Sequence, residues 1–113
     1  YEAALREVDA RLQEVLGWVA ALPPEERRHT TVLLTADHGR GQSDWTSHGF
    51  FDRGSGDVFI GALGEQLQGR GEVDPDAEQR DVRPTIERLF GLCPPAGDDG
   101  RALEAIVGGL PCR

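Results

Sequence analysis

The chain has 113 residues, 38% of them hydrophobic, with a formal net charge of −8 and a pI of about 4.7. This length allows one modest domain or part of a larger one. An acidic surface repels nucleic acid phosphates and anionic lipid, and no apolar run approaches the roughly 18 residues of a membrane span, so we expect neither a nucleic acid partner nor a membrane span.

The N-terminal third predicts a helix followed by a strand. Apolar residues recur at intervals of three and four from Leu5 to Leu22, which is typical of an amphipathic helix. Pro23 and Pro24 end it, and the polar residues 25–29 are expected to turn the chain. The short apolar run 31–36 is partly β-branched and predicts a buried strand of the kind found in parallel sheets.

The remainder predicts loops, one strand and two helices. Residues 57–62 form a second short apolar run, between two loops rich in glycine. A helix is expected to begin at Asp81, whose carboxylate would cap the exposed N–H groups, and to end near Gly91. A final helix is predicted over 101–107, and neither repeats nor an interdomain linker are evident.

Two cysteines, Cys93 and Cys112, fit either one disulfide in an oxidising compartment or two free thiols. Their spacing matches no CxxC motif, so the compartment stays open, whether periplasmic, secreted or cytoplasmic. The chain begins with Tyr1 and contains no methionine, from which we expect it to be an excerpt of a longer product.

Metal-ligating residues follow the first predicted strand. Asp37 and His38 come directly after it, and His48 lies ten positions beyond His38. Ligand sites in open α/β sheets gather at the carboxyl ends of strands. Imidazole and carboxylate together suit Zn²⁺, with Mn²⁺ less well matched. Binding one ion through both Asp37 and His38 requires a special turn, which Gly39 makes available.

These residues resemble the second half of the metal site of the alkaline phosphatase superfamily. That superfamily includes phosphatases, phosphodiesterases, sulfatases and cofactor-independent phosphoglycerate mutases. The resemblance rests on TADHGRG at 35–41, Trp45, SHG at 47–49, QRDVRPT at 79–85, LFGL at 89–92, Gly100 and Leu103. It covers most of the chain in the same order.

The resemblance implies a three-layer α/β/α sandwich with a mainly parallel sheet, in which residues 1–113 form the C-terminal part of a single catalytic domain. It also implies two divalent metal ions, with Asp37 and His38 binding one and His48 the other. The nucleophile and the Asp-x-x-x-His motif that the family carries upstream of these ligands are not found before Asp37 in this chain. The chain alone is therefore expected to be inactive, and its partners to be the N-terminal half of the same protein and a small-molecule phosphate ester.

Other polar residues near the motif have less specific interpretations. Arg40 fits bidentate contact with a phosphate oxygen, or a plain surface arginine. Trp45 fits a substrate pocket, or packing of its loop. The loop hydroxyls, including that of Ser47, are expected to form loop hydrogen bonds, and Asp44 and Asp52 are interpreted as turn residues.

Within the superfamily, His48 favours the two-zinc phosphatase and phosphodiesterase branches over the sulfatases, and Arg40 departs from the asparagine usual in phosphoglycerate mutases. We therefore expect a metal-dependent hydrolase of phosphoric esters. The alternatives are a sulfatase or mutase-like member, and a non-catalytic remnant or binding module.

Overall fold

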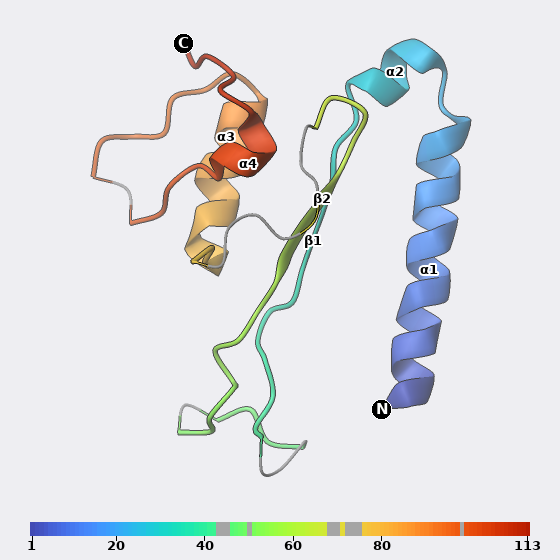
Figure 1. Cartoon of the computed structure of the whole chain (residues 1–113), viewed down its shortest axis with the longest axis vertical. Coiled ribbons are helices and arrows are strands. Elements are labelled where there is room, and N and C mark those ends of the chain that lie inside the picture. Colours follow the sequence, from blue (N-terminus) through green and yellow to red (C-terminus); the bar gives the residue numbers. More distant parts are fainter. Residues whose placement is uncertain (43–45, 50, 68–70, 72–75, 98) are drawn as a thin grey trace. The chain divides into compact units, whose positions relative to one another are not determined.

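The computed structural model describes residues 1–42, 46–49, 51–67, 71, 76–97 and 99–113. The chain divides into two compact units, one comprising Tyr1–Val32 and Gly64–Gln66 and the other Leu33–Leu63 and Leu67–Arg113. Figure 1 labels the elements of both. Among the described residues, no helix combines the length and apolar character needed to cross a lipid bilayer.

The first unit contains helices α1 (Glu2–Ala21) and α2 (Pro24–Arg28). The predicted amphipathic helix is confirmed, and it ends immediately before Leu22 and the two prolines. The expectation of a simple turn over 25–29 is wrong, because Pro24 occupies the first turn of α2, where a missing N–H costs nothing. Helix α1 has no buried residue in this structure.

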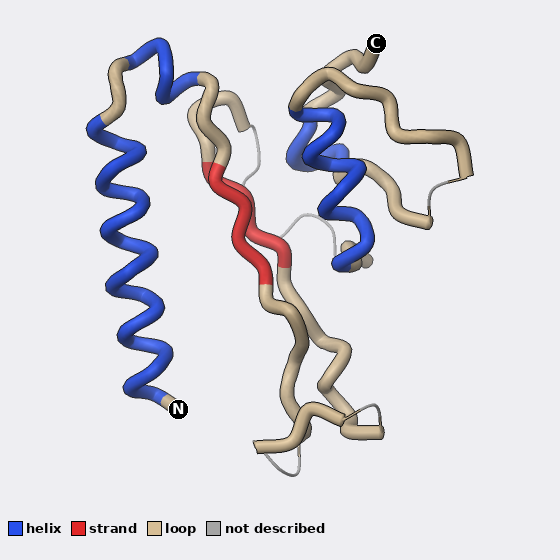
Figure 2. Tube along the Cα trace, turned by 180° about the vertical axis from the view of Figure 1, so that it is seen from behind, coloured by secondary structure: helices blue, strands red, loops and turns tan. Residues whose placement is uncertain are grey.

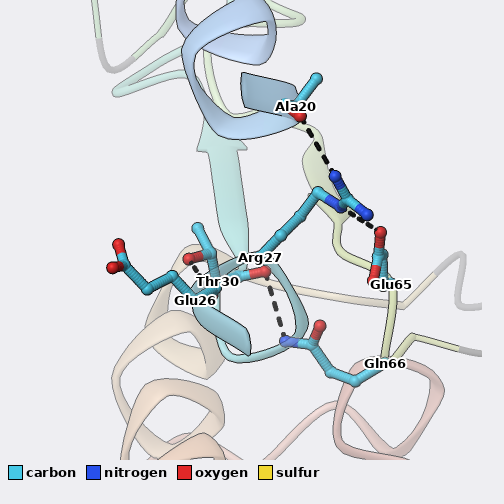
Figure 3. A network of polar contacts seen from close by, with 6 residues as sticks. All are labelled: Ala20, Glu26, Arg27, Thr30, Glu65 and Gln66. Carbon is cyan, nitrogen blue, oxygen red and sulfur yellow. Dashed lines mark hydrogen bonds and ion pairs between the residues drawn. The ribbon is translucent and has the colours of Figure 1, made fainter. Parts of the chain in front are cut away.

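Polar contacts hold the short segment 64–66 in the first unit (Figure 3). The guanidinium of Arg27 donates to the carbonyl of Ala20 at 3.2 Å and also pairs with the carboxylate of Glu65. The amide of Gln66 donates to the carbonyl of Thr30 at 3.4 Å. One arginine thus joins the end of α1 to a segment 38 residues further along the chain.

The second unit carries a two-stranded antiparallel sheet of β1 (Val32–Thr35) and β2 (Ile60–Leu63), although Val32 itself is counted with the first unit. The hydroxyl of Thr35 donates to the carbonyl of Phe59 at 2.7 Å. In Figure 2 the strands are red, and the tan segments that continue from them run side by side. The predicted first strand is confirmed with shorter bounds, and the second lies later in the chain than the predicted 57–62.

The predicted three-layer α/β/α sandwich with a mainly parallel sheet is wrong for the described residues, whose sheet has two antiparallel strands. Parallel strands need a crossover connection, usually a helix. The described residues between β1 and β2 contain no helix, and they fold back along themselves. The apolar composition of 31–36 suggested burial on both faces, but β1 is only half-buried and its last residue is exposed.

Two segments continue from the strands, residues 36–42 after β1 and residues 51–59 before β2, and we call them the two arms. Glycine allows these arms to approach closely. The amide of Gly39 donates to the carbonyl of Ser55 at 2.7 Å, and that of Gln42 donates to Arg53 at 3.0 Å. A Cβ on Gly39 would lie 2.0 Å from the carbonyl oxygen of Gly54, which itself has φ +94°. Only glycine fits either position without moving the backbone.

The helical part of the second unit consists of η1 (Gln79–Asp81), α3 (Val82–Leu89) and α4 (Glu104–Val107). The helix predicted from Asp81 is confirmed, and the last helix begins at Glu104, three residues later than expected. Leu103 and Val107 are almost fully buried, together with Pro84 and Thr85 of α3. These four residues form the small core of this part.

A buried polar network joins the start of α3 to the segment before α4. The Asp81 carboxylate, 3% exposed, accepts from the amides of Glu78 and Arg101, both at 2.9 Å. The Thr85 hydroxyl donates to the Asp81 carbonyl at 2.6 Å and accepts from the Leu103 amide at 3.0 Å. The expectation that Asp81 caps α3 is therefore wrong, because its side chain binds the chain on either side of the helix.

Cys93 and Cys112 form a disulfide, which decides between the two alternatives left open by the sequence. The amide of Arg113 also donates to the carbonyl of Gly91 at 2.8 Å. The C-terminal segment is thus closed into a loop that contains α4.

Candidate metal centre

Asp37 and His38 follow β1 directly, and their side chains turn toward each other. The amide of His38 donates to Oδ1 of Asp37 at 3.0 Å. The other carboxylate oxygen, Oδ2, lies 3.7 Å from Nε2 of His38. The local turn therefore brings a carboxylate oxygen and an imidazole nitrogen of adjacent residues close together, as binding of a shared ion requires.

The separation of these two atoms is close to that of two ligands on one zinc ion. With ligand bonds of about 2.0–2.1 Å and tetrahedral geometry, two donor atoms lie about 3.4 Å apart. The observed 3.7 Å between Asp37 Oδ2 and His38 Nε2 differs little from this value. Asp37 and His38 therefore fit one ion.

The other ring nitrogen of His38 has a backbone partner. Nδ1 lies 2.7 Å from the carbonyl oxygen of Gly39. A carbonyl oxygen only accepts, so Nδ1 carries the hydrogen in this contact. In the neutral ring, Nε2 then keeps its lone pair and faces Asp37. Such a contact to a backbone carbonyl orients metal-ligating histidines in many proteins.

His48 lies against His38. Their ring centroids are 4.3 Å apart and their planes are inclined by 22°, so the rings are stacked. The amide of Gly41 donates to the carbonyl of Ser47 at 2.9 Å, so the backbone next to His48 is also joined to the segment that follows His38. His38 therefore lies beside each of the other two candidate ligands, Asp37 and His48.

The stacking of the two rings restricts whether both histidines can bind the same metal ion. The lone pairs of imidazole lie in the plane of the ring, and the two planes are nearly parallel. An ion about 2 Å from a nitrogen of one ring, in its plane, lies outside the plane of the other. The arrangement therefore fits two neighbouring ions better than one, and the pairs in two-metal sites are about 3.5–4 Å apart.

The donor atoms are accessible to solvent. The side chains of Asp37 and His38 are 87% and 39% exposed, and His48 is exposed. Within the described part of the chain, no three His, Cys, Asp or Glu side chains converge as a set that could hold an ion. Asp37, His38 and His48 are therefore open to solvent, and an ion held by any of them would need further ligands.

Two other candidate residues are placed differently. Arg40 is exposed and lies where the arm passes Gly54: a Cβ on Gly54 would approach the Arg40 carbonyl oxygen to 2.7 Å. Trp45, like Asp44, lies outside the described residues. The Ser47 hydroxyl donates to Asp52, in agreement with the expected loop hydrogen bond.

Asp52 has a larger role than that of the turn residue suggested by the sequence. One of its carboxylate oxygens accepts from Ser47 and from the amide of Gly49, the two neighbours of His48. The signal in the sequence was an acceptor four residues after a histidine that lies between a serine and a glycine. Asp44 lies at the same separation on the other side of His48, so the separation alone does not show which aspartate is the partner.

A cavity of about 410 Å³ lies elsewhere in the second unit, between the end of β1 and α3. Its lining includes Thr35, Val82 and Ile86 but none of the three candidate ligands.

Comparison with protein-family models, with curated proteins and with solved structures finds no match for this chain.

Proposed function

We propose that the complete protein containing this chain is a metal-dependent hydrolase of phosphoric esters, and that this chain contributes half of a two-metal site. Asp37 and His38 would hold one ion and His48 the other, most favourably Zn²⁺. The observation that carries the proposal is the stacked pair of His38 and His48, with Asp37 directed at Nε2 of His38.

Three features of these residues support a metal role. The Asp37–His38 separation suits a single ion, the Nδ1 contact of His38 leaves Nε2 as the nitrogen available to metal, and the ring of His48 lies in a second plane. When bound, a pair of ions stabilises the charge on phosphoryl oxygens and activates a hydroxyl nucleophile. The residues of this chain would hold and orient the ions, and the nucleophile would come from elsewhere in the protein.

The network around Asp81 supports the resemblance from an independent part of the chain. Three of the residues that carry it there are hydrogen-bonded in a chain, Thr85 to the carbonyl of Asp81 and Leu103 to the hydroxyl of Thr85. Gly100 lies so close to η1 that a Cβ would be 2.1 Å from the carbonyl oxygen of Arg80. The contacts give each of these residue types a structural reason at its position.

A second candidate is a non-catalytic remnant or binding module, with the same residues and weak metal binding. It is favoured by the open geometry, since the described residues offer no group of three acidic, histidine or cysteine side chains able to hold an ion. This candidate predicts metal binding without turnover.

Hydrolysis of 4-nitrophenyl phosphate and bis(4-nitrophenyl) phosphate by the complete protein, with added Zn²⁺ or Mn²⁺, separates the two candidates. We expect turnover of at least one ester, and an activity lower by roughly 100-fold or more in His38→Ala. Removing a residue that only hydrogen-bonds to a metal ligand already lowers activity or metal affinity by about 10–100-fold. His29→Ala is the matched control, since His29 lies at the end of α2 in the other unit. Full activity in His38→Ala would remove this residue from the site.

A further inference from the structure

One side chain, that of Asp52, binds the residues on both sides of His48. Oδ2 of Asp52 accepts a hydrogen bond from the hydroxyl of Ser47 and another from the amide of Gly49, at 2.8 Å. The amide of Asp52 donates in return to the carbonyl of Gly49 at 2.9 Å. The residues before and after His48 are therefore both bound to Asp52.

The same loop is held from the opposite side by the arm that carries His38. The buried Gly41 donates its amide to the carbonyl of Ser47 at 2.9 Å. Ser47 is thus bound through its carbonyl to one arm and through its hydroxyl to the other. With both neighbours of His48 restrained, its ring has a defined place against His38.

We propose that Asp52 is the positioning residue for His48, holding its imidazole in the stacked place from which it would bind the second ion. The metal-binding part of this inference rests on the proposed function, whereas the positioning part rests on the contacts alone. A carboxylate suits the task because it only accepts and has several lone pairs, so one oxygen serves two donors. The side-chain amide of asparagine keeps an oxygen that can accept both hydrogen bonds, but without the charge that strengthens them in a carboxylate.

The alternative, that Asp52 only stabilises the turn, leads to a different expected result. If Asp52 only stabilised the turn, its removal would lower stability and leave the surroundings of the His48 ring as they are in the folded state. If Asp52 positions the ring, its removal changes those surroundings even in a fully folded protein. Stacking makes the difference measurable, because each imidazole shifts the ring resonances of the other.

The test is NMR of the complete protein with labelled histidine, with His38 and His48 assigned by substitution. In Asp52→Ala we expect the His48 ring resonances to lose the stacking shift and the affinity for the second zinc ion to fall about 10–100-fold. Asp52→Asn should restore part of both, since it keeps one acceptor. Asp57→Ala is the matched control, an exposed carboxylate of the same arm that should leave both unchanged.

Unchanged His48 resonances in folded Asp52→Ala would overturn the inference. If that variant does not fold, Ser47→Ala removes one of the two donors and should produce a smaller change of the same kind, and no change would overturn the inference equally. A wild-type protein that binds no zinc would contradict the proposed function, while the resonances would still decide the role of Asp52.

Discussion

The carboxylate of Asp81 accepts a hydrogen bond from the backbone amide of Arg101 at 2.9 Å, across 20 residues of sequence. Its second oxygen accepts from the amide of Glu78, at the same distance. One buried side chain therefore ties η1 to the segment that leads into α4. The residue next to Arg101 is Gly100, whose missing Cβ permits the approach.

Asp81→Ala should lower the free energy of unfolding by about 2–4 kcal/mol, since two backbone amides lose a charged acceptor that is itself buried. Urea denaturation of the protein measures the change. Asp99→Ala is the control, because Asp99 is exposed nearby and its removal should cost little. Equal stability of the two variants would contradict the role given to Asp81.

Thr85→Val should destabilise the protein by about 1–3 kcal/mol, although valine has nearly the same shape. The hydroxyl is lost both as the donor to Asp81 and as the acceptor for Leu103. Thr85→Ser keeps the hydroxyl and should cost only the buried methyl group, about 1 kcal/mol. A serine variant less stable than the valine variant would show that packing, and not hydrogen bonding, dominates at this position.

Gly39→Ala should separate the two arms and weaken metal binding, because the added Cβ would meet the carbonyl oxygens of Gly54 and Asp57 at 2.0 and 2.5 Å. Gly56→Ala is the matched control on the same arm, where a Cβ meets nothing within 4 Å. Zinc titration and thermal unfolding of both variants provide the comparison. Retained zinc affinity in Gly39→Ala would mean that the close approach of the arms is not required for the site.

Reduction of the Cys93–Cys112 disulfide should lower stability by about 3 kcal/mol, the value typical of a closed loop of this length. Cys93 is exposed, so dithiothreitol should reach it. Unfolding with and without the reductant measures the effect, and a double variant with serine at both positions is the control. The double variant should match the reduced protein and should not respond to dithiothreitol.

The sequence predicted those elements whose signal is local. The apolar period from Leu5 to Leu22 and the two prolines after it determine α1, and Pro84 with its neighbours determines α3. The antiparallel sheet could not be predicted, because the direction in which β2 pairs depends on the path of 36–59. That path depends on the close contact of Gly39 with Gly54, which are far apart in sequence.

The site was predictable by residue type but not by geometry. Asp37, His38 and His48 could be named as candidate ligands from their chemistry and spacing. The stacking of the two rings and the anchoring by Asp52 depend on hydrogen bonds across the arm. Asp81 was assigned to the correct helix start, but its partners could not be predicted, because Arg101 lies in a segment without regular structure.

The central claim, that this chain holds half of a two-metal site, is tested most directly by the zinc stoichiometry of the complete protein in native mass spectrometry. We expect two ions per chain in the wild type and the loss of one ion in each of His38→Ala and His48→Ala, while His29→Ala keeps both. A wild type that binds no zinc, or variants of His38 and His48 that both retain two ions, would contradict the claim.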